Sequence, residues 1–330
     1  MSEKKFQVTA MGAALVDIYA QVSDEKLTLL GSQKGAMTLV DAAQAENLGA
    51  QVEIESQASG GSAANTIAGI AGLGSKSAFI GKVADDELGA FFTQEMKAAN
   101  IHFEQSPLKG GDPTGRCLVL ITPDAERTMH TLIGAAAATS PDDLDKNILA
   151  QTACFFSEGY VFDSPSATQA FIAGAQMVKQ AGGKVAFSLS DPFCVERHLQ
   201  QFKTLLGEKV DLMLGNQAEA EALFGTQDMA QIIATIQAQG FDAVITRSEK
   251  GAVIVQNGDV TEVPAEPVTE LVDLTGAGDQ FAAGFLSGLA QRQPAAICGK
   301  MGAIAAAEVI THIGPRLQTD ITEKINAVKI

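Results

Sequence analysis

The sequence predicts an α/β fold with a mostly parallel central sheet that helices cover on both faces. Two observations predict it. Short apolar runs alternate with longer amphipathic segments through most of the 330 residues, and the segments between the runs are long enough for crossover helices. Strands joined through helices are typical of right-handed crossovers between parallel neighbours. No linker and no internal repeat divides the chain, so we expect a single domain over residues 1–330.

Six apolar runs fit the strands of this sheet. In chain order they are Phe6–Met11, Ser77–Ile80, Ala153–Phe156, Lys184–Leu189, Val210–Leu214 and Ala243–Thr246. The segments between them fit helices, because apolar residues recur at helical spacing in Asp86–Ala99, Pro165–Ala181 and Asn216–Phe224. The same spacing predicts a last long helix from Asp279 to about Arg292.

Two regions depart from this alternation. Val16–Gln57 and Pro113–Ile133 mix polar and apolar residues irregularly or with strand-like alternation, as in Arg116–Ile121. Strand-like insertions near the carboxyl edge of a parallel sheet often cover a ligand site. We therefore predict a discontinuous β-sheet lid over roughly residues 16–57 and 113–133. The alternative is a plain pair of extra edge strands.

Composition and charge exclude several classes of function. Apolar residues make up 46% of the chain and charged residues 19%, which is typical of a globular protein. The net charge of −16 argues against nucleic-acid and anionic-membrane partners, because both repel an acidic protein. The most membrane-like stretch, Pro294–Ile310, contains Lys300 and Glu308 and is too short for a span. The first residues lack the apolar core of a signal peptide, so we expect a cytoplasmic protein.

The cysteines predict neither a structural zinc site nor disulfides. They are scattered along the chain without C-x-x-C pairing or a nearby histidine cluster: Cys117, Cys154, Cys194 and Cys298. We expect four ordinary thiols.

The most informative segment is the glycine-rich turn before the last long helix, Val272–Phe281. Gly276 and Gly278 allow a tight turn whose backbone N–H groups point outward together. Those groups and the positive end of the helix dipole form an anion site, which phosphoryl transfer requires. Asp279 at the same helix start could accept a hydrogen bond from an attacking hydroxyl, and the dipole favours its ionised form.

This segment has two other interpretations. Asp279 alone fits a simple helix N-cap after a glycine turn. A nicotinamide-binding oxidoreductase shares the fold class, but G-A-A-L-V-D follows the first strand in place of G-x-G-x-x-G. A P-loop sequence is also absent.

Two segments together resemble the signatures of the ribokinase-like (PfkB) carbohydrate and nucleoside kinases. Residues 273–285, D-L-T-G-A-G-D-Q-F-A-A-G-F, resemble the C-terminal signature, and residues 60–74, beginning G-G-S-A-A-N-T, resemble the N-terminal one. They stand in the family's order, and the resemblance covers essentially the whole chain. It implies a three-layer α/β/α fold with a small β-sheet lid, and an ATP-dependent kinase.

The resemblance also implies roles for individual residues. Asp279 would activate the acceptor hydroxyl, and Gly276, Ala277 and Gly278 would form the anion hole. The acceptor's hydroxyl groups would be bound by the first signature and by the aspartate that follows the first strand, which together nominate Asp17, Gly60, Gly61 and Asn65. A carboxylate and an amide can both bind neighbouring sugar hydroxyls.

On the nucleotide side, Asn216 and Glu219 resemble the family's N-x-x-E motif, which supports Mg²⁺ and phosphate, often through water. Mg²⁺ prefers oxygen ligands and keeps several waters, which fits this pair; the alternative is a capping pattern. The loop after the strand at 243–246 resembles the nucleotide loop, which nominates Thr246, Arg247 and Gly251. Arg247 could bind an ATP phosphate, or lie free in solvent.

The family resemblance suggests one further ion. Some members bind a monovalent cation such as K⁺ through segments that correspond to Asp273, Thr275 and Gly314 in this sequence. His312 in the same loop fits a packed or surface histidine better than a ligand.

The acceptor is left open between a nucleoside and a sugar. The interval between Asp17 and Gly60 and the stretches Gly35–Leu39, Pro123–Met129 and Leu189–Phe193 resemble the adenosine-kinase branch, in which Arg127 would be a lid residue that reaches substrate or phosphate. Candidate walls for a base are Leu15, Met37, Leu39 and Phe162. Candidate anchors for a phosphorylated sugar are Lys34, Lys109, Arg116 and Arg127.

We therefore expect an adenosine-like nucleoside first and a simple sugar such as ribose or fructose second. A sensor without catalytic activity is the alternative from another class. The expected partners are ATP and this acceptor, and the protein is expected to be a monomer or a homodimer.

Overall fold

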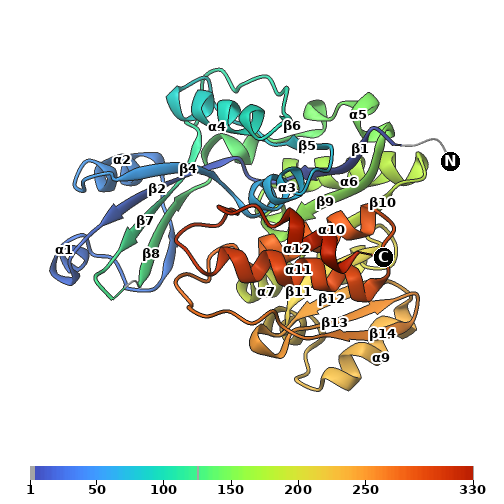
Figure 1. The fold of residues 1–330 in the computed structure, drawn as a ribbon. Helices are drawn as coiled ribbons and strands as arrows, with labels where there is room; N and C mark the ends of the chain where they lie inside the picture. The colour runs from blue at the N-terminus through green and yellow to red at the C-terminus, as the bar shows by residue number, and fades with distance from the viewer. Residues whose placement is uncertain (1–3, 125, 330) are drawn as a thin grey trace.

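The computed structural model describes residues 4–124 and 126–329 and contains two β-sheets. Met1–Glu3, at the start of the segment examined for a signal peptide, and Ala125, within the predicted lid, lie outside the described residues. The larger sheet has nine strands and the smaller has five. Figure 1 shows the smaller sheet projecting to one side of the larger one.

The larger sheet is mostly parallel, with the strand order β14-β13-β12-β11-β10-β9-β1-β5-β6. Its parallel strands are β1 Phe6–Met11, β5 Ser77–Ile80, β6 Ile101–His102, β9 Thr152–Glu158, β10 Lys184–Ser188, β11 Leu212–Asn216 and β12 Asp242–Thr246. Two antiparallel strands complete one edge, β13 Ala252–Gln256 and β14 Asp259–Val263.

Helices cover both faces of this sheet. One apolar cluster packs against α3 Ser62–Gly72, α4 Glu87–Ala98, α10 Ala277–Ala290 and α11 Ala295–Val309. The opposite cluster packs against α5 Lys146–Ala150, α6 Pro165–Gln180, α7 Pro192–Leu205, α8 Gln217–Phe224 and α9 Met229–Gln239. The predicted three-layer arrangement is therefore confirmed. A further helix, α12 Thr322–Val328, packs on α11.

The smaller sheet has the strand order β3-β8-β7-β2-β4. Its strands are β2 Leu15–Gln21, β3 Met37–Leu39, β4 Ser56–Gly60, β7 Gly115–Ile121 and β8 Arg127–Leu132. Two short helices, α1 Asp24–Leu29 and α2 Ala42–Gly49, lie along it (Figure 1). Leu27 of α1 and Leu48 of α2 are buried in the same apolar cluster as Ile18 and Leu120 of the sheet. We call this sheet and its two helices the lid.

Most of the predicted elements are confirmed with small shifts at their ends. The runs at 6–11 and 77–80 coincide with β1 and β5, and the helix predicted at 86–99 begins and ends one residue inside those limits. The strand predicted at 210–214 begins two residues later, at Leu212. The last long helix begins at Ala277, two residues before the predicted start, so Asp279 lies in its first turn.

No helix among residues 4–124 and 126–329 is long and apolar enough to cross a membrane. The apolar stretch at 294–310 forms α11, whose buried residues pack against α10 and the sheet.

Candidate active site

The motifs found in the sequence meet at the carboxyl-terminal edge of the parallel strands. Ligands bind at this edge in α/β folds, because the loops after the strands and the helix N-termini gather there. A cavity of about 90 Å³ lies at the edge and is lined by residues of both signatures and both nucleotide-side motifs, among them Ser62, Asn216, Glu219, Thr246, Gly278 and Asp279.

Asp279 joins the two signatures directly. The Ser62 hydroxyl donates to Asp279 Oδ1 at 2.6 Å, and Asn65 Nδ2 donates to Asp279 Oδ2 at 3.1 Å. Both donors lie in α3, more than two hundred residues earlier in the sequence. The two donors fix the orientation of the Asp279 carboxylate within the candidate active site.

Burial shifts the acidity of this carboxylate. Removal from water raises the pKa of Asp279 to about 6, although the hydrogen bonds from Ser62 and Asn65 partly oppose that shift. From the helix dipole alone, the sequence predicts a weak base. The pKa in the structure makes Asp279 a stronger base that is still mostly ionised at neutral pH, because desolvation outweighs the dipole.

The glycine turn places backbone donors beside Asp279. Gly276 has a φ of 79°, and a Cβ there would lie 2.5 Å from the Cα of Pro315, so only glycine fits without strain. Ala277 donates its N–H to the Leu274 carbonyl at 3.2 Å. Among the described residues, no such partner is found for the N–H of Gly278, which lies in the first turn of α10 and on the cavity wall.

A second glycine pair brings three backbone segments together. Gly61 has a φ of 100°, and a Cβ there would lie 2.2 Å from the carbonyl oxygen of Ala13. A Cβ at Gly60 would lie 2.3 Å from Oδ2 of Asp17. The predicted acceptor-binding residues Asp17, Gly60 and Gly61 are therefore neighbours, at the junction of β2, β4 and α3.

Asp17 shares its electrostatic environment with Asp279. The pKa of Asp17 is raised to about 6, mainly by burial and in part by the charge of Asp279, while the charges of Arg316 and Arg127 oppose the shift. Two carboxylates and two guanidinium groups thus influence one another in this region. The sequence did not single out Arg316.

The side-chain oxygen of Asn65 is available to accept a hydrogen bond. Its Nδ2 donates to Asp279, whereas its Oδ1 is buried without a partner among the described residues. Buried polar atoms usually have a partner, so an unpaired one in a candidate active site suits a ligand hydroxyl group.

Glu158 is a functional candidate that the sequence analysis missed. It ends β9 and is 1% exposed, and its carboxylate accepts the N–H groups of Ala13 at 2.9 Å and Ala63 at 2.6 Å. Glu158 therefore holds the turn after β1 against the start of α3. Burial raises the pKa of Glu158 to about 7, against the effect of its two backbone donors. A charged residue at the carboxyl end of an apolar strand was the available signal.

Asn216 and Glu219 lie as predicted at the start of α8, where they also cap the helix. Asn216 Nδ2 donates to Glu219 Oε1 at 2.6 Å, and the Glu219 N–H donates to Asn216 Oδ1 at 2.9 Å. Glu219 is 5% exposed, and burial raises its pKa to about 7. The charges of Asp191 and Asp279 contribute to this shift in the same direction as burial, and the hydrogen bond from the Asn216 N–H opposes it. Both the capping and the functional interpretation of this pair therefore remain compatible with the geometry.

The donor set at this edge fits a water-bound magnesium ion better than a metal held by protein ligands alone. Within residues 4–124 and 126–329, no group of three or more His, Cys, Asp or Glu side chains is arranged to hold a metal. Glu219 and Asp279 are carboxylates on one cavity without a cationic partner on its wall. Mg²⁺ commonly binds one or two carboxylates and completes its shell with water and phosphate oxygens.

The nucleotide loop is only partly directed at the cavity. Thr246 lines it, at the end of β12. Arg247 instead pairs with Glu262 at 2.8 Å on β14, and Gly251 has a φ of 78° in the tight turn that precedes β13. In this structure Arg247 therefore forms its ion pair at the edge of the larger sheet.

Arg127 connects the lid to the turn before α10. Its Nη1 donates to Thr275 Oγ1 at 2.8 Å, and its Nη2 lies 2.5 Å from Asp273 Oδ2. Only 12% of the Arg127 side chain and 6% of the Asp273 side chain are exposed, so the ion pair is largely removed from water. The resemblance implies that Arg127 reaches substrate or phosphate, whereas in this structure it binds protein groups of the glycine turn.

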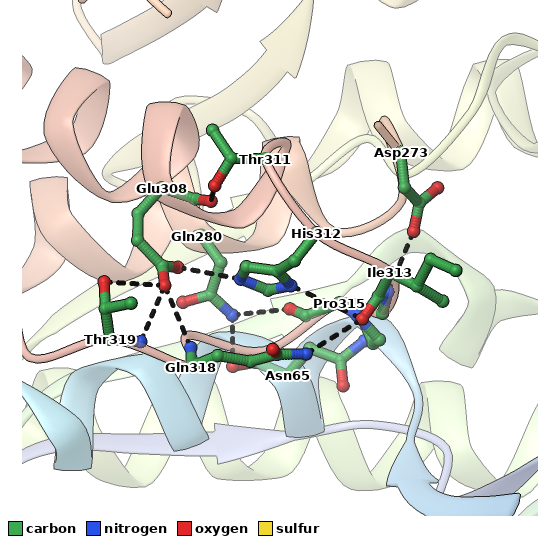
Figure 2. Close-up of polar contacts among 11 residues, drawn as sticks. Asn65, Asp273, Gln280, Glu308, Thr311, His312, Ile313, Pro315, Gln318 and Thr319 are labelled. Carbon is green, nitrogen blue, oxygen red and sulfur yellow. Dashed lines mark hydrogen bonds and ion pairs between the residues drawn. The ribbon is translucent and has the colours of Figure 1, made fainter. Parts of the chain in front are cut away.

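Figure 2 shows how the loop after α11, residues 311–319, is held beside this turn. At its start, the Gly314 N–H donates to Asp273 Oδ2 at 2.9 Å. The predicted cation-binding residues Asp273, Thr275 and Gly314 are thus adjacent, and the Thr275 N–H donates to the other oxygen of Asp273 at 3.0 Å. Both oxygens of Asp273 are therefore already bonded.

Two buried side chains fix the rest of the loop (Figure 2). Gln280 Nε2 donates to the carbonyl oxygens of Pro315 at 2.8 Å and Asn65 at 3.2 Å. Glu308 Oε1 accepts the N–H groups of Gln318 at 3.0 Å and Thr319 at 2.7 Å. The loop is therefore fixed to α10, α3 and α11.

The remaining acceptor candidates separate into different environments. Met37 and Leu39 of β3 are 46% and 56% exposed, so they are free to contact a ligand. Phe162 is buried among Phe171, Phe187 and Phe202 and belongs to the core. Lys34 pairs with Asp24 and Asp124 within the lid.

A family model and a relative that match this chain are both described as carbohydrate kinases. A family model described as pfkB family carbohydrate kinase matches residues 25–322. The fructokinase of Klebsiella pneumoniae is 30% identical over 241 residues, which cover 71% of this chain and 78% of the relative.

Two solved structures resemble the chain over almost its whole length. The adenosine kinase from Sinorhizobium meliloti is 39% identical with a TM-score of 0.91, covering 98% of this chain and 99% of that one. A probable sugar kinase from Rhizobium etli CFN 42 has the same identity and TM-score, covering 98% of both chains. These neighbours differ in the acceptor that their names suggest.

Proposed function

Because this chain belongs to the pfkB family of carbohydrate kinases, we propose that it transfers the γ-phosphoryl group of ATP to a hydroxyl group of an adenosine-like nucleoside. The family implies a sugar or nucleoside kinase with ATP as the phosphoryl donor. The choice of a nucleoside is supported by the likeness to the S. meliloti adenosine kinase over 98% of this chain.

One observation carries the proposal. The Asp279 carboxylate lies at the N-terminus of α10, where Ser62 and Asn65 of the first signature bind its two oxygens. Backbone donors of the glycine turn, the proposed acceptor-binding residues and a carboxylate with a raised pKa therefore meet at one place. Phosphoryl transfer needs this combination of positioning and charge stabilisation.

The proposed step balances as follows. The acceptor oxygen bonds to the γ-phosphorus, while the bond from that phosphorus to the bridging oxygen of ATP breaks and ADP leaves. Asp279 accepts the hydroxyl proton as negative charge moves onto the leaving oxygen. The N–H groups at the start of α10, with Gly276 and Ala277 shaping the turn and Gly278 donating, stabilise the transferring group.

On the acceptor side, Asp17, Gly60, Gly61 and Asn65 bind the hydroxyl groups in this proposal. Asp17 accepts hydrogen bonds and the unpaired Oδ1 of Asn65 accepts another. Gly60 and Gly61 let the acceptor approach the backbone, because side chains there would fill that space.

On the nucleotide side, Asn216 and Glu219 would hold Mg²⁺ partly through water. The ion would neutralise phosphate charge in a protein that is strongly acidic overall. Thr246 and Gly251 shape the nucleotide loop. Arg247 would have to leave Glu262 to bind a phosphate.

Potassium near Asp273, Thr275 and Gly314 remains a prediction. The Arg127 guanidinium already pairs with the same carboxylate, so a cation would have to share or replace that partner. Turnover measured in potassium chloride against choline chloride at equal ionic strength tests it, and equal rates would contradict a functional cation.

A sugar kinase is the second candidate, since the K. pneumoniae fructokinase is 30% identical to this chain. One acceptor panel decides between the two. ADP production from Mg-ATP is measured with adenosine, guanosine, inosine, ribose and fructose, and we expect the highest kcat/KM with adenosine. A clear preference for ribose or fructose would favour the second candidate. Binding without phosphoryl transfer to any acceptor would favour a sensor.

A further inference from the structure

Arg316 is a buried cation that the proposed mechanism does not use. Neither Nε nor Nη2 of its guanidinium has a hydrogen-bond partner among the described residues, and both atoms are buried. Buried polar groups are usually paired, and an unpaired charged donor is costlier than a neutral one. A ligand that occupies the site would remove this cost.

The two unpaired nitrogens carry the parallel N–H groups of the guanidinium. These form a planar fork that can donate two hydrogen bonds side by side. Two neighbouring oxygen atoms on one ligand are therefore a matching partner.

The backbone on both sides of Arg316 is held in place (Figure 2). Before it, Asp273 accepts the Gly314 N–H and Gln280 binds the Pro315 carbonyl oxygen. After it, Glu308 accepts the N–H of Gln318. A side chain on such a fixed backbone is positioned before the ligand arrives, which lowers the entropy lost on binding.

Arg316 follows Pro315, which packs against Gly276 of the glycine turn, and its charge acts on Asp17, one of the predicted acceptor-binding residues. Its charge opposes the rise in the pKa of Asp17, more strongly than that of Arg127 does. Burial lowers the pKa of Arg316, and Glu95, Asp17 and Tyr19 oppose this effect. Yet among the described residues no ion pair joins Arg316 to Asp17 or Glu95. The guanidinium therefore acts on the charge of Asp17 without forming an ion pair with it.

We propose that Arg316 and Asp17 together recognise two neighbouring hydroxyl groups of the acceptor. A hydroxyl group both donates and accepts, whereas a carboxylate only accepts and a guanidinium only donates. Asp17 takes the two hydroxyl hydrogens, and the Arg316 fork donates to the two hydroxyl oxygens. The site therefore selects acceptors with a vicinal diol, such as a ribofuranose ring.

This inference rests on the proposed function only in placing the acceptor beside Asp17. It makes a prediction about recognition, which can be measured without phosphoryl transfer. A site built to bind a hydroxyl group rejects analogues that lack it, because its buried polar groups are then left unpaired.

The test compares acceptors that differ in one hydroxyl group. Calorimetric Kd and steady-state kinetics are measured with adenosine, 2′-deoxyadenosine and 3′-deoxyadenosine, and with ribose and 2-deoxyribose. The variants are Arg316→Ala and Arg316→Lys. Arg197→Ala is the matched control, because Arg197 lies on α7, is 45% exposed and pairs with Asp163. Thermal unfolding confirms that each variant is folded.

We expect Arg316→Ala to weaken binding of the diol compound by about 10- to 100-fold, the range of hydrogen bonds to a charged group. Binding of the deoxy compounds should change by less than about threefold, so selectivity for the diol collapses, while kcat changes little. Arg316→Lys should restore part of the affinity, since a lysine keeps the charge but loses the fork. Arg197→Ala should behave as wild type.

Three results would overturn the inference. They are an equal loss for diol and deoxy compounds, a loss confined to kcat, and a wild-type protein that binds none of the diol compounds. The first indicates a structural role and the second a role at the transferring phosphoryl group. If wild type discriminates diol from deoxy compounds through Arg316 but does not phosphorylate them, the proposed function fails and this inference stands.

Discussion

Asp279 must be ionised to accept a proton, yet it lies where burial disfavours its charge. Ser62 and Asn65 offset part of that effect and leave its pKa at about 6. A carboxylate with this pKa is a better base than an exposed one and is still available at neutral pH. The balance between desolvation and two hydrogen bonds therefore sets the pKa of Asp279 and with it the strength of this residue as a base.

Replacing that carboxylate tests its role. We expect Asp279→Asn to lower kcat by about 10²- to 10⁴-fold, the usual contribution of a positioned proton acceptor. Ser62→Ala, which removes one orienting bond and keeps the carboxylate, should lower kcat far less. Steady-state assays with Mg-ATP and the preferred acceptor measure both. Near-normal turnover in Asp279→Asn, with circular dichroism unchanged, would show that the residue is not the proton acceptor.

The pH profile of the free enzyme follows from the same group. Because Asp279 accepts the proton only when ionised, kcat/KM should fall as the pH drops through about 6. Asp17 titrates in the same range, so the fall should be steeper than for one group. The profile is measured between about pH 5 and pH 9 with both substrates well below saturation, so that kcat/KM reports the free enzyme. A flat profile down to pH 5 would contradict the raised pKa values.

Stability should change with pH in the opposite direction to activity. A carboxyl group whose pKa is higher in the folded state binds its proton more tightly when folded. Its contribution to stability is therefore largest below the unfolded pKa and is lost as the pH rises through the folded pKa. For Asp279 that interval runs from the ordinary pKa of an aspartate, 3.8, to its pKa of about 6 in the folded protein.

Asp279→Asn should consequently stabilise the ligand-free protein by on the order of 1–3 kcal/mol at pH 8 and by little at pH 4. Denaturant unfolding at both pH values measures this. The exposed Asp259 provides the control Asp259→Asn, for which we expect no comparable gain. A variant that is less stable than wild type at pH 8 would show that its hydrogen bonds outweigh the desolvation of its charge.

At the level of single residues, sequence prediction found the groups that lie in signatures and missed those that act through distant partners. Asp279, Asn65 and Asp17 meet in the structure. Glu158 and Arg316 lie outside any signature, and their significance depends on backbone and charges brought close by folding. Arg127 has its partner 146 positions away, which sequence spacing cannot reveal.

At the level of elements, the start of α3 depends on close packing that only glycine allows. Glu158 holds this helix start against the turn after β1, and Gly61 lets the Ala13 carbonyl oxygen approach. Two of the predicted acceptor-binding residues, Gly61 and Asn65, lie at this helix start. Their geometry therefore depends on one buried carboxylate and one residue without a side chain.

Gly61→Ala tests this dependence. The new Cβ would meet the Ala13 oxygen at 2.2 Å and force a residue with a φ of 100°, so we expect a loss of at least about 1–3 kcal/mol of stability and weaker acceptor binding. Gly74→Ala is the matched control, because Gly74 has a φ of 82° but nothing within 4 Å of a Cβ. Chemical denaturation and acceptor KM are compared. Equal effects in the two variants would show that the contact with Ala13 is unimportant.

The sequence pattern predicts the buried strands and the amphipathic helices, but it does not predict the antiparallel hairpin at one edge of the larger sheet. The hairpin of β13 and β14 was missed although Asn257 and Gly258 form its two-residue turn, with φ of 52° and 87°. An Asn-Gly pair between apolar strands is a strong hairpin signal. Its two strands were overlooked because the alternation of strand and helix had been extended along the whole chain.

At the level of the whole molecule, the fold class could be predicted because strand and helix alternate with different periods along the chain. How the lid is built could not. Helices α1 and α2 cover one face of the lid sheet, and neither was predicted within the irregular region. Both are short, and their stability depends on packing against the sheet, which the sequence pattern does not show.

The lid and the glycine turn before α10 are expected to move as a unit when the acceptor binds. Arg127 of the lid binds Thr275 and Asp273, so ordering one part orders the other. Hydrogen exchange should show that acceptor and nucleotide protect residues 16–57, 113–133 and 273–279 together.

Arg127→Ala should keep protection at 273–279 but lose it in the lid. Lys34→Ala, which breaks ion pairs only within the lid, should leave the coupling intact. Among the described residues, no other ion pair joins the lid to the glycine turn. Two results would therefore contradict this mechanism: lid protection that does not change in wild type when ligands bind, and joint protection of the lid and the turn that survives Arg127→Ala.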